Sequence, residues 1–172
     1  MVNERTTVHP ECTRTLRAHN FFVTVTRDYV RCPRCGFGIY PDSASGRFDV
    51  TGGFPVARGK LFWIAVEVKY GGNTSLPFSR VSESQRDWYK KHKEDYDMWL
   101  WFCVGSRIND TKKPRKTWLI PFKLFLELEE TLGRKSIPAN CDKIKSYELL
   151  WKGDGFWEIP AEHMLWDNAV LE

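Results

Sequence analysis

The sequence contains no long apolar run, no internal repeat and no low-complexity linker. Within its 172 residues, no stretch approaches the roughly 18 consecutive apolar residues that a membrane-spanning helix needs. The polar start, MVNERTT, has no apolar signal core either. We therefore expect a cytoplasmic protein without a membrane partner, and this length fits a single domain over residues 1–172.

The chain also lacks a large excess of one charge and an even set of cysteines. It has 26 lysines and arginines against 22 aspartates and glutamates, and this net charge of +4 permits a phosphate-bearing partner without requiring one. Five cysteines in a chain without a signal peptide argue against a disulfide framework. Aromatic residues, by contrast, make up 15% of the chain. We expect most of them in the core, in particular Trp63, Trp99 and Trp101.

The pattern of apolar residues, glycines and prolines predicts an α/β chain. Residues 61–68 are apolar on both faces, which is typical of a central strand covered on both sides. The run Ser82-Glu83-Ser84-Gln85 has the form of a capping box, and it begins a helix that ends near residue 95. The other predicted elements are a helix at 8–19, strands at 21–26, 98–104, 117–120 and 144–150, and a helix between Pro121 and Gly133. Together they predict a mixed central sheet flanked by helices.

Three charged residues lie at the edge of this apolar pattern. In an extended chain, residues i and i+2 share a face, so Glu67 and Lys69 point the same way at the end of an apolar strand. Asp49, on the preceding strand, lies at hairpin spacing and brings a second carboxylate. Two carboxylates and a lysine are suited to hold a hard cation such as Mg²⁺ and to position a water molecule. For a bare Glu-x-Lys sequence, a solvated strand end is the alternative.

Asp49, Glu67 and Lys69 together resemble the signature of the PD-(D/E)xK nuclease superfamily. A closer likeness, to RecU-type Holliday junction resolvases, covers residues 43–126. It rests on the run Thr74-Ser75-Leu76-Pro77-Phe78, on Gln85 at the start of a helix and on the run Trp118-Leu119-Ile120-Pro121. The resemblance implies a restriction-endonuclease-like fold. It also implies a dimeric, Mg²⁺- or Mn²⁺-dependent endonuclease of prokaryotic or phage origin that cuts branched DNA during recombination and repair.

The resemblance further implies how the site residues divide the work. Asp49 and Glu67 would hold Mg²⁺, Lys69 would order the attacking water, and Gln85 would sit beside the site. Two other functions stay open on the same residues. One is a related nuclease that cuts duplex or flap DNA, such as a restriction or repair enzyme. The other is a DNA-binding module in which the three charged residues form only an ion-pair cluster.

Nucleases of this kind also place a glutamate of the first helix in the site. This chain offers Glu11, Glu4 or, as a replacement, His9. We assign the role to Glu11, which makes it a fifth candidate catalytic residue.

Basic residues near this constellation are candidates for contacts with DNA phosphates. Charge clusters on helices and loops are also common on solvated faces, so both interpretations stay open. Binding through such residues would weaken steeply with added salt. The candidates are Arg80, Lys90, Lys112, Lys113, Arg115 and Lys116.

One pair of cysteines has the spacing of a zinc knuckle. Cys32 and Cys35 are separated by two residues and followed by glycine, within a segment at 27–42 that would form an insertion. A tetrahedral site needs four ligands, and His9 and Cys12 repeat the two-residue gap. Two ordinary reduced cysteines are the alternative.

The zinc hypothesis predicts a measurable metal content. We expect about one structural Zn²⁺ per purified chain, and the Cys32→Ser variant should lose it because the remaining ligands no longer form a tetrahedral set. Metal analysis by mass spectrometry measures both proteins. Wild-type protein purified without zinc would contradict the hypothesis.

Overall fold

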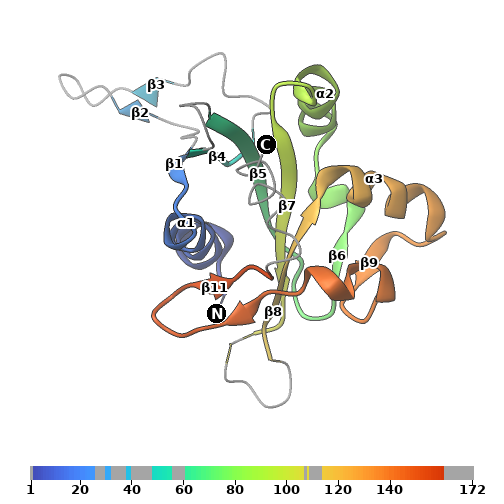
Figure 1. Cartoon of the computed structure of the whole chain (residues 1–172). Coiled ribbons are helices and arrows are strands. Elements are labelled where there is room, and N and C mark those ends of the chain that lie inside the picture. Colours follow the sequence, from blue (N-terminus) through green and yellow to red (C-terminus); the bar gives the residue numbers. More distant parts are fainter. Residues whose placement is uncertain are drawn as a thin grey trace.

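A five-stranded mixed sheet forms the centre of the protein (Figure 1). The structure, a computed structural model, describes residues 2–25, 30–31, 38–39, 48–55, 61–106, 108 and 114–160. The strands lie in the order β1-β4-β5-β7-β8, and β5 and β7 are parallel whereas the other neighbours are antiparallel. Their bounds are β1 (Phe22–Val25), β4 (Val50–Pro55), β5 (Leu61–Tyr70), β7 (Asp97–Val104) and β8 (Lys116–Pro121).

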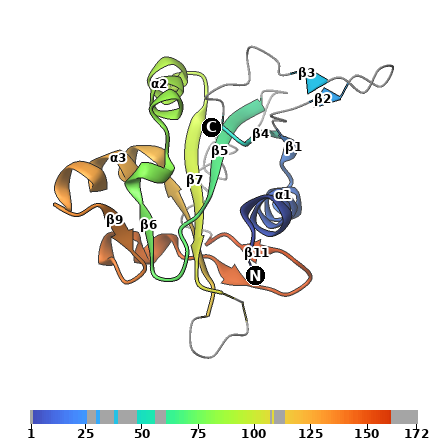
Figure 2. The same ribbon diagram turned by 180° about the vertical axis from the view of Figure 1, so that it is seen from behind.

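Helices cover both faces of this sheet. One face carries a π-helical turn (Glu4–Val8) and α1 (His9–Ala18), and the other carries α2 (Glu83–His92) and α3 (Phe122–Thr131) (Figures 1 and 2). The prediction of a mixed central sheet flanked by helices is therefore confirmed. None of the described helices is long and apolar enough to cross a membrane.

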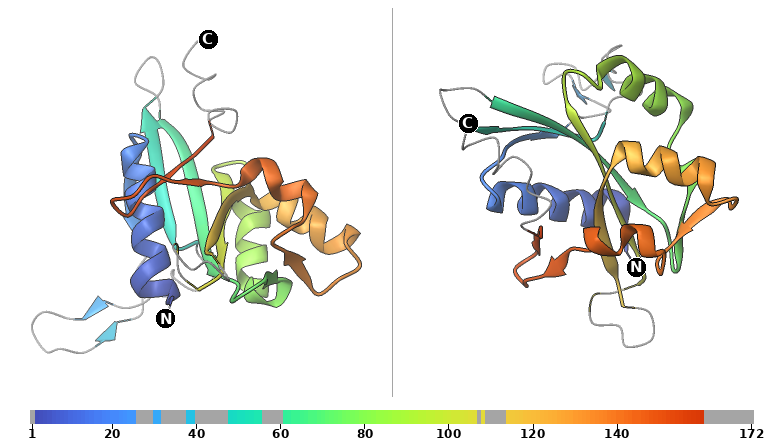
Figure 3. Two further views of the ribbon diagram at one scale, coloured as in Figure 1. Left: turned by 90° about the horizontal axis from the view of Figure 1, so that it is seen from below. Right: turned by 45° about the vertical axis from the view of Figure 1, so that its right-hand side comes forward.

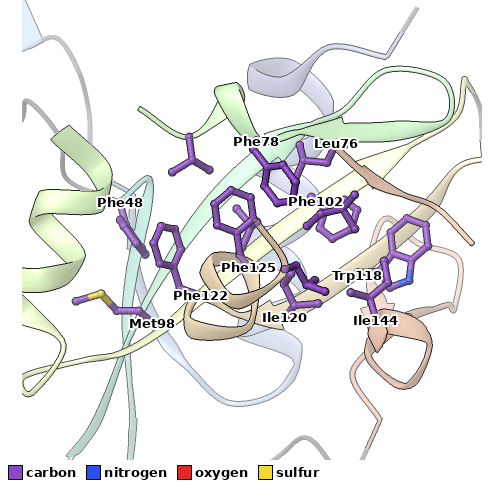
Figure 4. Packing of buried hydrophobic residues seen from close by; sticks show 14 of the residues in the cluster. Phe48, Leu76, Phe78, Met98, Phe102, Trp118, Ile120, Phe122, Phe125 and Ile144 are labelled. Carbon is purple, nitrogen blue, oxygen red and sulfur yellow. The ribbon is translucent and has the colours of Figure 1, made fainter. Parts of the chain in front are cut away.

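The core has two layers because the central strands are apolar on both sides. On β5, Ile64, Val66 and Val68 pack in a cluster with α1. Ala65 lies in the opposite cluster, with α3 and with residues of β7 and β8 (Figure 4). Alternate residues of β5 therefore point to opposite layers, as the double-sided apolar pattern predicted.

Short elements complete the chain around the sheet. The strands β6 (Ser75–Pro77) and β9 (Ser136–Pro138) pair with each other, as do β10 (Leu150–Trp151) and β11 (Trp157–Glu158). A separate ladder joins β2 (Val30–Arg31) to β3 (Gly38–Ile39). The cysteine pair at 32 and 35 lies between these two strands, outside the described residues.

Three predicted helix boundaries after β5 are confirmed, the start of α2 and both ends of α3, whereas α2 ends at His92 rather than near residue 95. The Ser82 hydroxyl accepts from the Gln85 backbone N–H at 3.3 Å, and the Gln85 side chain accepts from the Ser82 backbone N–H at 2.9 Å. Pro121 is the N-cap of α3, and Gly133 follows the helix with a φ of +60°, a conformation that favours glycine.

Two sequence predictions are wrong. Residues 144–150 do not form one strand, because a 3-10 helix (Asp142–Tyr147) precedes the two-residue β10. Ile144 and Tyr147 are three residues apart and both pack on the core, a spacing that the 3-10 helix aligns. Trp63 is not a core residue either, since it is 48% exposed, whereas Trp99 and Trp101 are buried as expected.

A buried ion pair fixes α1 against the sheet and the C-terminal hairpin. Glu11 Oε1 lies 2.5 Å from a guanidinium nitrogen of Arg115, and Glu11 Oε2 accepts from the Trp157 indole N–H at 3.1 Å. The Trp157 backbone N–H donates to the Thr15 hydroxyl at 2.9 Å. Figure 3 shows the β10–β11 hairpin beside α1. Segments from both ends of the described chain are therefore tied together.

This pair should be costly to break on one side only. The Glu11→Ala variant leaves the Arg115 guanidinium buried without its carboxylate, which should lower the free energy of unfolding by about 3–5 kcal/mol. Chemical denaturation measures the change. The double variant Glu11→Met/Arg115→Met should recover most of the loss because no unpaired charge remains. Equal losses in the single and double variants would contradict this role.

Candidate active site

The hairpin between β4 and β5 brings Asp49 next to the end of β5. Asp49 immediately precedes β4, and the register pairs Val50 with Val66. The Asp49 Oδ2 atom accepts a hydrogen bond from the Val68 backbone N–H at 2.8 Å. This bond fixes the carboxylate between the positions of Glu67 and Lys69, as the hairpin spacing predicted.

Glu67 is the centre of the group. Its side chain is fully buried, with 0% exposure. The Lys69 ammonium forms an ion pair with Glu67 Oε1, and the Gln85 side-chain amide donates to the same oxygen at 2.5 Å. The structure therefore brings together four of the five candidate catalytic residues, Asp49, Glu67, Lys69 and Gln85, from three separate elements.

The second oxygen of Glu67 has no partner within the described structure. Oε2 is buried and no hydrogen-bond donor of the described residues reaches it, while the neighbouring group is the Asp49 carboxylate. Burial raises the pKa of Glu67 well above its ordinary value, the neighbouring Asp49 carboxylate raises that pKa further, and Lys69 partly opposes both effects. Two carboxylates placed side by side in a buried setting need a shared proton or a cation between them.

A divalent cation fits this need. Oε2 of Glu67 and the carboxylate of Asp49 are hard oxygen donors, which Mg²⁺ and Mn²⁺ prefer. The described residues contain no cluster of three or more histidine, cysteine, aspartate or glutamate side chains with metal-binding geometry. An ion held by two carboxylates completes its shell with water and substrate phosphate oxygens, which is typical of Mg²⁺ sites. We therefore regard Asp49 and Glu67 as the residues that would hold it.

The assignment of Glu11 to the site is wrong. Its carboxylate is held by Arg115 and Trp157, away from this group. His9 is the first-helix residue that faces the site, since its Nε2 atom lies 3.8 Å from Asp49 Oδ2. Helical periodicity shows that His9 and Glu11 flank opposite sides of the apolar stripe that packs on the sheet, but it does not show which of them faces the site.

Glu4 lies at the end of β5 rather than among the candidate metal ligands. Its Oε2 atom accepts from the Tyr70 backbone N–H at 2.7 Å and from a guanidinium nitrogen of Arg80 at 2.8 Å. The Arg80 side chain remains 46% exposed. Glu4 therefore holds a partly accessible cation one residue beyond Lys69, a contact that the sequence did not reveal.

The other predicted DNA contacts have mixed outcomes. Arg115 is wrong as a surface phosphate contact, because it is 6% exposed and paired with Glu11. Lys90 is exposed and lies 3.3 Å from Asp87 on the same helix. Lys116 is 46% exposed and pairs with Glu148 at 3.0 Å. Lys112 and Lys113 lie outside the described residues.

The zinc hypothesis stays a prediction. Cys32 and Cys35 lie outside the described residues. Cys12 lies on α1 and is fully buried in the core layer between this helix and the sheet. Burial, together with the charge of Asp49, raises the pKa of its thiol well above the ordinary value. This raised pKa favours the thiol over the thiolate that zinc binds. The His9 side chain, the other proposed zinc ligand, lies next to the Asp49 carboxylate.

Comparison with known proteins does not identify a family. No protein-family model matches the chain, and no curated protein matches it. The functional argument therefore rests on the arrangement of these side chains.

The raised pKa of Glu67 predicts how stability depends on pH. The folded protein holds the Glu67 proton more tightly than the unfolded chain does. The resulting contribution to the free energy of unfolding is fully present below the pKa of an unfolded glutamate, about 4.3, and is lost as the pH rises through the raised pKa of the folded protein. The Glu67→Gln amide does not titrate, so the free energy of unfolding of this variant should rise relative to that of wild type as the pH increases, on top of a pH-independent cost for the lost ion pair with Lys69.

Chemical denaturation between pH 5 and pH 8 tests this expectation. The free energy of unfolding of Glu67→Gln, minus that of wild type, should increase with pH. Millimolar Mg²⁺ or Mn²⁺ should raise the melting temperature of wild type and have little effect on the variant, because binding to the folded state alone stabilises it. If the two proteins differ in free energy of unfolding by the same amount at every pH and respond equally to metal, the repulsion between the Asp49 and Glu67 carboxylates is contradicted.

Proposed function

We propose that this protein is a divalent-cation-dependent DNA endonuclease with a restriction-endonuclease-like fold. The observation that carries the proposal is the buried Glu67 carboxylate. It has one oxygen bound by Lys69 and Gln85 and the other unpartnered beside Asp49. A lysine, two carboxylates and a bound cation are the groups that phosphodiester hydrolysis needs.

The same observation weighs against a purely structural ion pair. If Glu67 served only stability, we would expect both of its carboxylate oxygens to have hydrogen-bond partners, because an unsatisfied buried oxygen lowers the free energy of unfolding. Here the neighbouring group is a second carboxylate, which destabilises the charged form further. Such an arrangement is typical of a functional site rather than of one selected only for stability.

Each side chain would contribute by position and charge. The Val68 N–H fixes Asp49, and Gln85 and Lys69 fix one oxygen of Glu67, so both carboxylates are oriented before a ligand arrives. The Lys69 ammonium would order the attacking water next to the scissile phosphate. When bound, the divalent cation would neutralise charge on the phosphate and stabilise the departing 3′ oxygen.

Within this class we propose a four-way junction as the substrate, with a role in recombination and repair. The support is the resemblance of residues 43–126 to RecU-type resolvases. In the structure, the stretch after Lys69 forms β6, and the turn that follows brings Arg80 to Glu4 at the end of β5. Resolution of a junction requires two incisions, so the proposal includes a two-fold dimer with one site on each chain.

Cleavage of synthetic DNA tests the reaction and its site together. Wild type should cut a labelled four-way junction only with Mg²⁺ or Mn²⁺, and Lys69→Ala and Asp49→Asn should each slow cleavage by about 100-fold or more, the scale for loss of transition-state charge stabilisation. Asp49→Asn should still bind DNA. Lys123→Ala is the matched control, because Lys123 is an exposed lysine on α3, with 78% of its side chain accessible.

The choice of DNA separates the remaining functions. Faster cleavage of flap or linear duplex than of the junction would favour a restriction or repair nuclease. Metal-independent binding of DNA with no cleavage of any substrate would overturn the endonuclease proposal and favour a binding module.

A further inference from the structure

Two exposed aromatic side chains lie in one cross-strand row of the sheet. The register pairs Phe22 with Gly53 and Gly53 with Trp63, so β1, β4 and β5 contribute one residue each. Phe22 is 70% exposed and Trp63 is 48% exposed. One residue lies on the edge strand and the other on the central strand, and adjacent exposed aromatic side chains of this kind often mark a binding surface.

This row shares its face with the candidate active site. Along β5, Ile64, Val66 and Val68 belong to the core layer beneath α1, so Trp63, Glu67 and Lys69 point to the opposite side. Trp63 and Glu67 are four positions apart, a span of about 13 Å at about 3.3 Å per residue. The aromatic row and the proposed hydrolytic group therefore lie along a single strand and face the same way.

Three exposed lysines lie at the end of the helix that leads into β7. The last turn of α2 carries Lys90 and Lys91, and Lys93 follows it, all of them exposed. The chain then enters β7 at Asp97, whose partner on β5 is Ile64, the neighbour of Trp63. Exposed aromatic rings are a feature of surfaces that bind single-stranded nucleic acid, where bases stack on the rings and phosphates meet positive charge.

We propose that Trp63, together with Phe22, stacks an unpaired base of the DNA strand that is being cut. A stacked strand advances about 3.4 Å per nucleotide, so the base on Trp63 lies within about four nucleotides of the scissile phosphate. The inference rests on the proposed nuclease function and adds a substrate feature to it: the DNA has unpaired nucleotides next to the cut.

The apolar area is too small for a second copy of this chain. Two aromatic side chains bury at most about 400 Å² together, whereas a stable interface takes about 800 Å² from each partner. Among the described residues, the other exposed large apolar side chains are Val25 and Leu150. Val25 pairs with Val50 on the α1-facing side of the sheet, and Leu150 lies in the C-terminal hairpin.

Equilibrium binding to two DNA probes tests the proposal. The non-cleaving Asp49→Asn protein is titrated against a blunt duplex and against the same duplex with a four-nucleotide single-stranded tail, and fluorescence anisotropy gives each Kd. Trp63→Ala should weaken binding of the tailed DNA about tenfold, the scale for one stacked base, with little change for the blunt duplex. Trp63→Phe should retain most of the preference for the tail, because a ring remains.

Controls separate stacking from other causes. Leu150→Ala removes an exposed apolar side chain away from this face and should change neither Kd. Equal losses for both probes, or none for either, would overturn the stacking role. Conversion of a dimer to monomers by Trp63→Ala, measured by sedimentation, would overturn it in favour of self-association.

The outcome for the nuclease is read independently. Cleavage by wild type together with an unchanged tail preference in Trp63→Ala overturns the stacking role and leaves the nuclease in place. If wild type prefers the tailed DNA, Trp63→Ala loses this preference and wild type cuts no DNA, the stacking role stands and the nuclease proposal is overturned. Absence of both binding and cleavage in the wild type would overturn both proposals.

Discussion

The burial of one carboxylate in the central strand constrains the surrounding structure. Glu67 lies on β5, between β4 and β7, with no exposed side-chain surface. A charge in such a place is tolerated only with compensating groups close by. Lys69 from the same strand and Gln85 from α2 supply part of the compensation, and the adjacent Asp49 makes it incomplete. The contact of α2 with the sheet at Gln85 meets part of this requirement, whereas the hairpin between β4 and β5 adds a second carboxylate that works against it.

The sequence predicted the helices and long strands well because their signals are local. A capping box needs only four consecutive residues, and Ser82 and Gln85 form it as expected. The apolar runs at 61–68 and 98–104 predicted β5 and β7 because buried strands are apolar on both sides. The 3-10 helix (Asp142–Tyr147) was missed because its few buried residues resemble a short strand.

Exposure was harder to predict, since it depends on what the rest of the chain covers. Trp63 has the same local pattern as its buried neighbours on β5, yet α3, the helix of its face that contacts the sheet most, packs over β7 and β8. Local sequence contains no information about where a helix from elsewhere will end on a sheet. Tertiary packing decides such cases.

The site was predicted where its residues lie close in sequence and mispredicted where they do not. Glu67 and Lys69 are two positions apart, and Asp49 is one hairpin away, so backbone periodicity was sufficient. The first-helix residue was wrong because two candidates flank one apolar stripe, and only the ion pair with Arg115, 104 residues away, shows which side faces the sheet. His9, not Glu11, lies beside Asp49.

The tether between α1 and the C-terminal hairpin has a consequence for how the protein is made. The helix that presents His9 to Asp49 is held by Trp157, through Thr15 and Glu11. During synthesis, Trp157 is added after all the residues of the candidate site, which lie between His9 and Gln85 in the sequence. Until Trp157 has been added, the nascent chain lacks the contact that holds this helix in place, so the complete constellation forms only after the β10–β11 hairpin has been made.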